Sequence, residues 1–72
     1  MNVKNVLYKI GCKREAFALW GFHNNYFCLL SKDNIKAIKT NYNKATEEEK
    51  SLLKKLVNEW CEVNRCPSLY ID

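Results

Sequence analysis

The sequence predicts an α+β fold: a small antiparallel meander of three to four strands, with one long C-terminal amphipathic helix packed on one face. Two observations predict it. In the first half, apolar residues alternate with polar ones or gather in short aromatic-rich runs, as they do in strands. In the last third they recur at helical spacing. With 72 residues, the chain is expected to form a single domain, 1–72.

The first strand is predicted over residues 3–10. Within it, Val6, Tyr8 and Ile10 follow a period of two, which would place their side chains on one face of the sheet. A polar turn region over residues 11–15 ends this strand.

The second and third strands are predicted over residues 16–22 and 26–31, two apolar runs separated by a His-Asn-Asn segment at 23–25. Asparagine tolerates the left-handed backbone conformation of tight hairpin turns, so this segment predicts a hairpin. A helix over residues 15–20 competes with the second strand, because alanine and leucine are good helix formers.

A fourth strand is predicted over residues 35–40, after a turn signal at 32–34. A short helix over residues 33–39 competes with it, because Ile35 and Ile38 are three residues apart. The sequence leaves this choice open.

The C-terminal helix is predicted over residues 47–64, where the apolar residues occupy about half of a helical wheel. Thr46 and Glu49 have the spacing of a capping box at its start. Pro67 ends the helix, and a short tail, residues 67–72, leaves a terminal strand open.

The charge is unevenly distributed. Residues 1–45 carry eight basic and two acidic side chains, whereas residues 46–72 carry four basic and six acidic ones, for a net charge of +4. Such asymmetry points to a binding partner for the basic half.

We expect a cytoplasmic protein without a membrane partner. Lys4 and Lys9 interrupt the apolar N-terminal run, unlike the core of a signal peptide. The longest uncharged stretch, residues 16–31, is shorter than the roughly 20 apolar residues of a membrane span. Cytoplasmic thiols are kept reduced, so we interpret the four cysteines as free and mostly buried.

Neither a metal site nor a cofactor is predicted. Cys12, Cys28, Cys61, Cys66 and His23 are of the types that bind zinc, but they lack the paired spacing of structural zinc sites. Only Cys61 and Cys66 come near it, and Cys61 falls on the apolar face of the predicted helix.

No catalytic residues are predicted, and we expect that the protein is not an enzyme. Cys12 is the one thiol with cationic neighbours, Lys13 and Arg14, which could activate it. His23, the single histidine, lies in a predicted turn far along the chain from this cysteine. With two glycines in the chain, a glycine-rich phosphate loop is excluded.

The leading hypothesis is a non-catalytic module that binds, and by binding can inhibit, a host protein or nucleic-acid-processing complex. Small size and the lack of a catalytic constellation are typical of accessory proteins of phages and mobile elements. Aromatic anchors with a charged rim characterise protein interfaces. The predicted partner-binding residues are Trp20, Phe22, Tyr26, Lys32, Lys36 and Lys39. Self-association into a homodimer stays open.

The alternative is a single-stranded or non-specific nucleic-acid-binding protein, in which lysines track phosphates and exposed rings of a sheet face stack on bases. A pI of about 8.9 falls just short of the value above 9 that is typical of a dedicated nucleic-acid domain. The residues predicted for this role are Lys13, Arg14, Lys32, Lys36, Lys39 and Lys44.

Overall fold

The computed structural model describes residues 2–26 and 30–72, and within these residues it is helical and contains no strand. The predicted α+β fold is therefore wrong. The elements in chain order are α1 (Val3–Lys9), α2 (Lys13–His23), α3 (Lys32–Asn41), the 3₁₀ turn η1 (Tyr42–Lys44), α4 (Glu47–Val63) and the 3₁₀ turn η2 (Pro67–Leu69).

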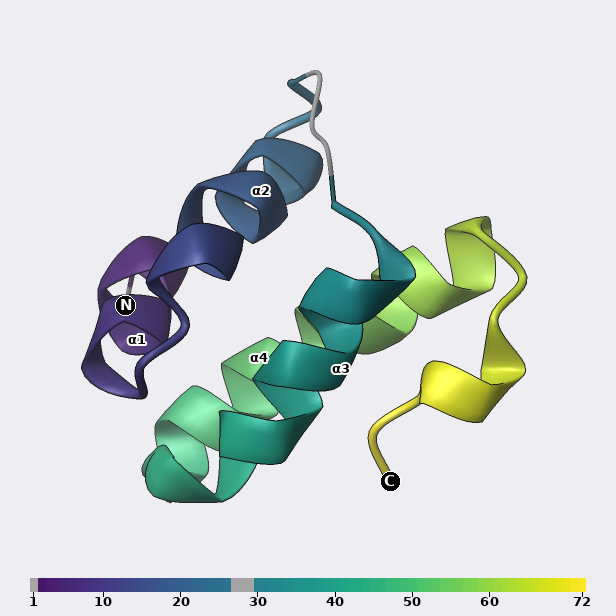
Figure 1. The fold of residues 1–72 in the computed structure, drawn as a ribbon. Coiled ribbons are helices and arrows are strands. Elements are labelled where there is room, and N and C mark those ends of the chain that lie inside the picture. Colours follow the sequence, from purple (N-terminus) through teal and green to yellow (C-terminus); the bar gives the residue numbers. More distant parts are fainter. Residues whose placement is uncertain (1, 27–29) are drawn as a thin grey trace.

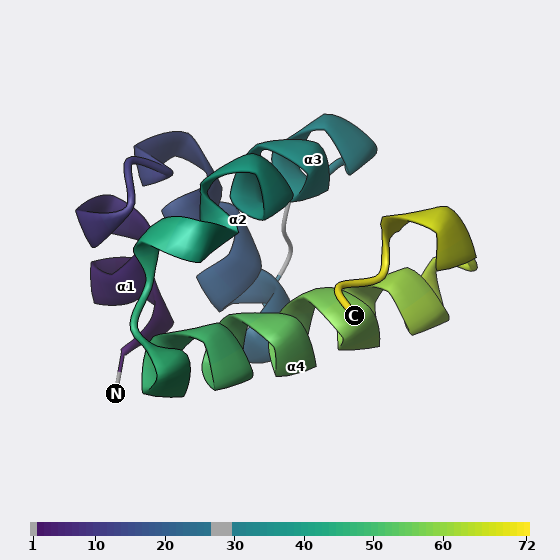
Figure 2. The same cartoon turned by 90° about the horizontal axis from the view of Figure 1, so that it is seen from below.

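The longest helix, α4, runs along one side of the molecule, and α1, α2 and α3 lie on its other side (Figure 2). Helices α1 and α2 form a close pair at one end (Figure 1). After α4, the chain turns back so that η2 contacts both α3 and α4. None of the helices in the described residues is long and apolar enough to cross a membrane.

The core is assembled from all four helices. Its fully buried side chains are mostly aliphatic, which suits interdigitating packing. Trp60 of α4 adds one large ring and is only 5% exposed. The largest side chains with essentially no exposure are Leu7, Ile10, Leu19, Ile35, Ile38, Leu53, Leu56 and Val57.

The strand predicted over residues 3–10 is helix α1. Tyr8, which fitted the period of two, is 50% exposed, while its neighbour Leu7 is fully buried. Burial follows helical spacing instead, at Val3, Val6, Leu7 and Ile10. Over seven residues, a strand period of two and a helical period of about 3.6 share several positions. The segment was therefore interpreted as a strand because Tyr8 fits the period of two.

The predicted hairpin, with strands over 16–22 and 26–31, is wrong because its asparagines end a helix. Asn25 has a φ of 62°, and the N–H of Tyr26 donates to the carbonyl of Gly21 at 2.8 Å. This is a Schellman motif, which, like the predicted hairpin turn, requires a residue in the left-handed conformation. The competing helix over 15–20 lies within α2. Part of the third predicted strand, residues 27–29, lies outside the described residues.

The strand predicted over residues 35–40 is helix α3, in agreement with the competing helical interpretation. Ser31 begins this helix with a capping box, in which its hydroxyl accepts from the backbone N–H of Asn34. The tail likewise forms η2 instead of a strand. The side chain of Asn58 holds this tail by bonding both the N–H and the carbonyl of Ile71.

Helix α4 covers nearly the range that its apolar pattern predicts, and its capping box is present. The N–H of Thr46 donates to Glu49 Oε1 at 2.8 Å, and the N–H of Glu49 donates back to Thr46 Oγ1 at 3.3 Å. Lys9 Nζ, at the end of α1, lies 3.0 Å from Glu49 Oε2. The same carboxylate thus caps α4 and ties it to α1.

Glu49→Gln should make the stability of the fold less dependent on pH. The N–H of Thr46 and then the ammonium of Lys9 hold the pKa of Glu49 below its usual range. A lowered pKa stabilises the fold above the unfolded value of about 4.3, and this stabilisation is lost as the pH falls through the folded value. Glutamine can still cap Thr46 but carries no charge. The urea unfolding midpoints of the wild type and of Glu49→Gln at pH 7 and pH 2.5 test this. The wild type should have the higher midpoint at pH 7 only, and the same difference between the two proteins at both pH values would contradict the prediction.

Candidate interaction site

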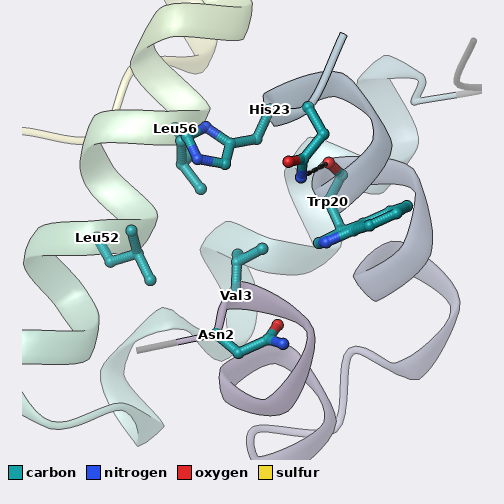
Figure 3. Close-up of a pocket in the computed structure, with 7 residues that line it drawn as sticks. Asn2, Val3, Trp20, His23, Leu52 and Leu56 are labelled. Carbon is teal, nitrogen blue, oxygen red and sulfur yellow. Dashed lines mark hydrogen bonds between the residues drawn. The ribbon is translucent and has the colours of Figure 1, made fainter. Parts of the chain in front are cut away.

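A groove of about 360 Å³ opens where the start of α1, the end of α2 and the middle of α4 meet (Figure 3). We call it the Trp20 groove. Its lining residues are Asn2, Val3, Trp20, His23, Asn24, Leu52 and Leu56.

The Trp20 groove contains apolar side chains, but more of its accessible lining is polar than apolar. Leu52 and Leu56 of α4 face the ring of Trp20 across it, with Val3 of α1 between them (Figure 3). His23 and Asn24 are exposed at the end of α2. The groove therefore offers a partner side chain hydrogen-bonding groups as well as apolar contacts.

Next to the groove, three aromatic rings form a cluster that we call the aromatic platform: Phe17, Trp20 and Tyr26. The ring centroids of Phe17 and Trp20 lie 5.6 Å apart, and Tyr26 stacks on Trp20 at 5.3 Å. Phe17 is 64% exposed and Tyr26 is 61% exposed. Lys4 Nζ lies 4.4 Å from the centroid of the Trp20 ring, close enough for a cation–π interaction.

Local structure explains how the platform forms. Phe17 and Trp20 are three residues apart on α2, so their side chains lie on the same face of the helix. The Schellman motif then reverses the chain after Asn25, which brings the ring of Tyr26 back over Trp20. The same asparagine that suggested a hairpin therefore assembles the platform.

The predicted partner-binding residues divide into two groups. Trp20 and Tyr26 belong to the platform, whereas Phe22 does not. Trp20 and Phe22 are both half-buried and pack against the core. Phe17 was missed, although its spacing from Trp20 would have indicated it once this segment was interpreted as a helix. The groove residues of α1 and α4 carry no signal in the sequence, because only the fold brings them beside Trp20.

The three lysines predicted with these aromatics lie elsewhere, on α3. Lys32 and Lys36 are exposed and line a second groove beside η2. Lys39, half-buried on the same helix, lies close enough to lower the pKa of Cys61 slightly. They are not part of the aromatic platform.

The cations predicted for nucleic acid also fall into two groups. Lys13 and Arg14 begin α2, and Lys44 lies in η1, near enough to Cys12 to act on its pKa. Lys32, Lys36 and Lys39 form the second group and follow α3 at spacings of four and three residues. None of these three lysines is part of the aromatic platform.

Cys12 and Cys61 are buried, and their surroundings do not activate these two thiols. Burial, and next the charge of Glu15, raise the pKa of Cys12. Burial, and next the neighbouring Cys66, raise the pKa of Cys61. A raised pKa keeps a thiol protonated and a weak nucleophile at neutral pH.

Among the described residues, no three His, Cys, Asp or Glu side chains are grouped so that they could hold a metal ion. Cys12, Cys61 and Cys66 are free thiols. Cys28, the fourth cysteine of the predicted ligand set, lies outside the described residues.

Comparison with known proteins gives no match among protein-family models, curated proteins or solved structures. The function is therefore argued from the groove and the platform alone.

Proposed function

We propose that this protein is a non-catalytic module that binds a partner protein through the Trp20 groove and the aromatic platform. The observation that carries the proposal is the stacking of exposed rings beside the Trp20 groove. Phe17 and Tyr26 each expose more than half of their surface, and Trp20 belongs to both features.

The energetics of interfaces support this assignment. Tryptophan and tyrosine dominate the binding energy of protein interfaces when they meet a partner in a desolvated pocket. A domain this small buries a limited share of its apolar surface in its core. The three aromatic rings of the platform therefore represent apolar area that a partner could bury. In the complex, one large apolar side chain would enter between Trp20 and the leucines of α4, while the partner covers Phe17 and Tyr26.

The charges around the platform favour an acidic partner. Lys4 lies over the Trp20 ring, and Lys13 and Arg14 are exposed at the start of α2. Glu15, the acidic residue of α2, is 7% exposed over the whole residue, and α1 carries no acidic residue. Complementary charges at the rim would speed association and select against basic competitors.

In the cytoplasm, where we place the protein, such binding could inhibit a host complex by occupying one of its own docking sites. Selection of a random peptide library on the immobilised protein tests the binding step. We expect enriched peptides with one large apolar residue and acidic neighbours. A bait carrying Phe17→Ser and Tyr26→Ser serves as the control. Equal enrichment on both baits, or no enrichment on the wild-type bait, would contradict the proposal. If the wild-type protein forms dimers in solution and the double substitution makes it monomeric, the surface serves self-association instead.

Nucleic-acid binding is the second candidate, because the platform could also stack bases beside Lys4. We rank it lower because the lysines of α3 are not part of the aromatic platform, and because the pI of about 8.9 falls short of that of a dedicated nucleic-acid domain. Fluorescence anisotropy with a single-stranded oligonucleotide across a salt series distinguishes the two candidates. Tight binding whose logarithm falls linearly with log salt would favour nucleic acid, and no binding at low salt would remove it.

A further inference from the structure

A second groove lies on the opposite side of the structure from α1, between the first two turns of α3 and the segment that follows α4. It has a volume of about 300 Å³ and is lined by Lys32, Lys36 and the segment Arg65–Leu69. We call it the basic groove. It shares no residue with the Trp20 groove or the aromatic platform.

Three basic residues line the basic groove, and no acidic residue is part of its lining. Lys32, Lys36 and Arg65 are all exposed, and within the described residues none of them takes part in an ion pair. Lys32 and Lys36 lie four residues apart on α3, a spacing at which like charges destabilise a helix. An anion bound between them would remove this repulsion.

The backbone of Arg65 gives an independent indication. It has a φ of 55° and occupies the left-handed position of the Schellman motif that ends α4, where the N–H of Cys66 donates to the carbonyl of Cys61 at 2.8 Å. The helices α1 and α2 end in the same motif with Gly11 and Asn25, the residue types that tolerate this conformation. Arginine is unfavourable there, so the strain points to a role for its side chain.

We propose that the basic groove binds a phosphomonoester dianion. A phosphate monoester carries close to two negative charges at neutral pH and three strong acceptor oxygens. Arg65 can donate two parallel hydrogen bonds to such a group, while the two lysines and the hydroxyl of Ser68 offer further donors. Pro67 and Leu69 provide an apolar wall for the carbon skeleton that carries the phosphate.

Amide NMR shifts of the ¹⁵N-labelled protein test the proposal at pH 7.5 and constant ionic strength. The probes are inorganic phosphate and phenyl phosphate, with sodium chloride as the reference salt. We expect saturable shifts confined to residues 32–36 and 65–69 with both phosphates, and weaker binding at pH 5, where the monoester loses its second charge. Tighter binding of phenyl phosphate would identify an organic ester as the natural ligand, and equal binding would identify the free ion.

Arg65→Gly separates binding from folding. Glycine relieves the left-handed backbone, so the variant should be at least as stable as the wild type and yet bind phosphate at least tenfold more weakly. Lys36→Ala should weaken binding similarly, and Lys55→Ala, on the exposed face of α4, should leave it unchanged.

Three results would overturn the proposal: shifts that chloride reproduces, wild-type affinity in Arg65→Gly, or shifts in these segments with a single-stranded oligonucleotide and none with phosphate. The last would assign the groove to nucleic acid. Because the probes and residues differ from those of the Trp20 groove, failure here leaves the protein-binding proposal intact.

Discussion

Trp60→Ala should remove a large part of the stability of the fold. The ring of Trp60 is 5% exposed and packs within the core cluster. Truncating a buried tryptophan to alanine costs about 3–5 kcal/mol, and a domain of this size has on the order of 4–11 kcal/mol in total. Each kcal/mol lowers the Tm of a small domain by about 4–8 °C, so we expect a drop of at least about 12 °C. Thermal and urea unfolding followed by circular dichroism measure it.

The matched control is Val63→Ala, in the last turn of the same helix. Val63 is 66% exposed, so its truncation should change the free energy of unfolding by no more than about 0.5 kcal/mol. A similar loss in both variants would mean that α4 does not bury the face described above. A stable Trp60→Ala protein would place the ring at the surface and contradict the core.

The second large effect concerns binding. Combining Phe17→Ala with Tyr26→Ala should weaken the complex with a selected peptide at least tenfold, because truncated aromatic anchors at an interface cost about 2 kcal/mol or more. The fold should change little, since both rings are mostly exposed. Isothermal titration calorimetry gives the affinity, and urea unfolding gives the stability of the same samples.

Tyr70→Ala is the control for this pair. Tyr70 is also exposed, but it follows η2 and lies outside the groove and the platform. Its substitution should leave the affinity unchanged. A platform variant that binds as tightly as the wild type would show that peptides engage another surface.

The fold could be predicted from the sequence only where a helix is long and well capped. Over the 17 residues of α4, apolar positions repeat often enough to exclude a period of two, and Thr46 and Glu49 mark the start. The 7 residues of α1 complete only two turns, so Tyr8 could pass for part of a strand. In α2, aromatic residues favour strands by propensity, and packing of the buried Leu19 against the core overrides them.

The candidate site was predicted in part. Trp20 and Tyr26 were identified by composition, because exposed aromatic anchors are common at interfaces. Composition could not distinguish Trp20 from Trp60; in the fold Trp60 is buried in the core, whereas Trp20 is half-buried and packs against the core from its edge. Val3 and Leu56 enter the groove from helices far apart in the sequence, so neither could be foreseen.

We propose that Trp20 forms the centre of a protein-binding surface. Iodide quenching of Trp20 fluorescence in a Trp60→Phe variant, with and without a selected peptide, tests this role. We expect iodide to quench Trp20 in the free protein, and bound peptide to protect it strongly. Fluorescence that iodide cannot quench in the free protein, or quenching that bound peptide leaves unchanged, would contradict it.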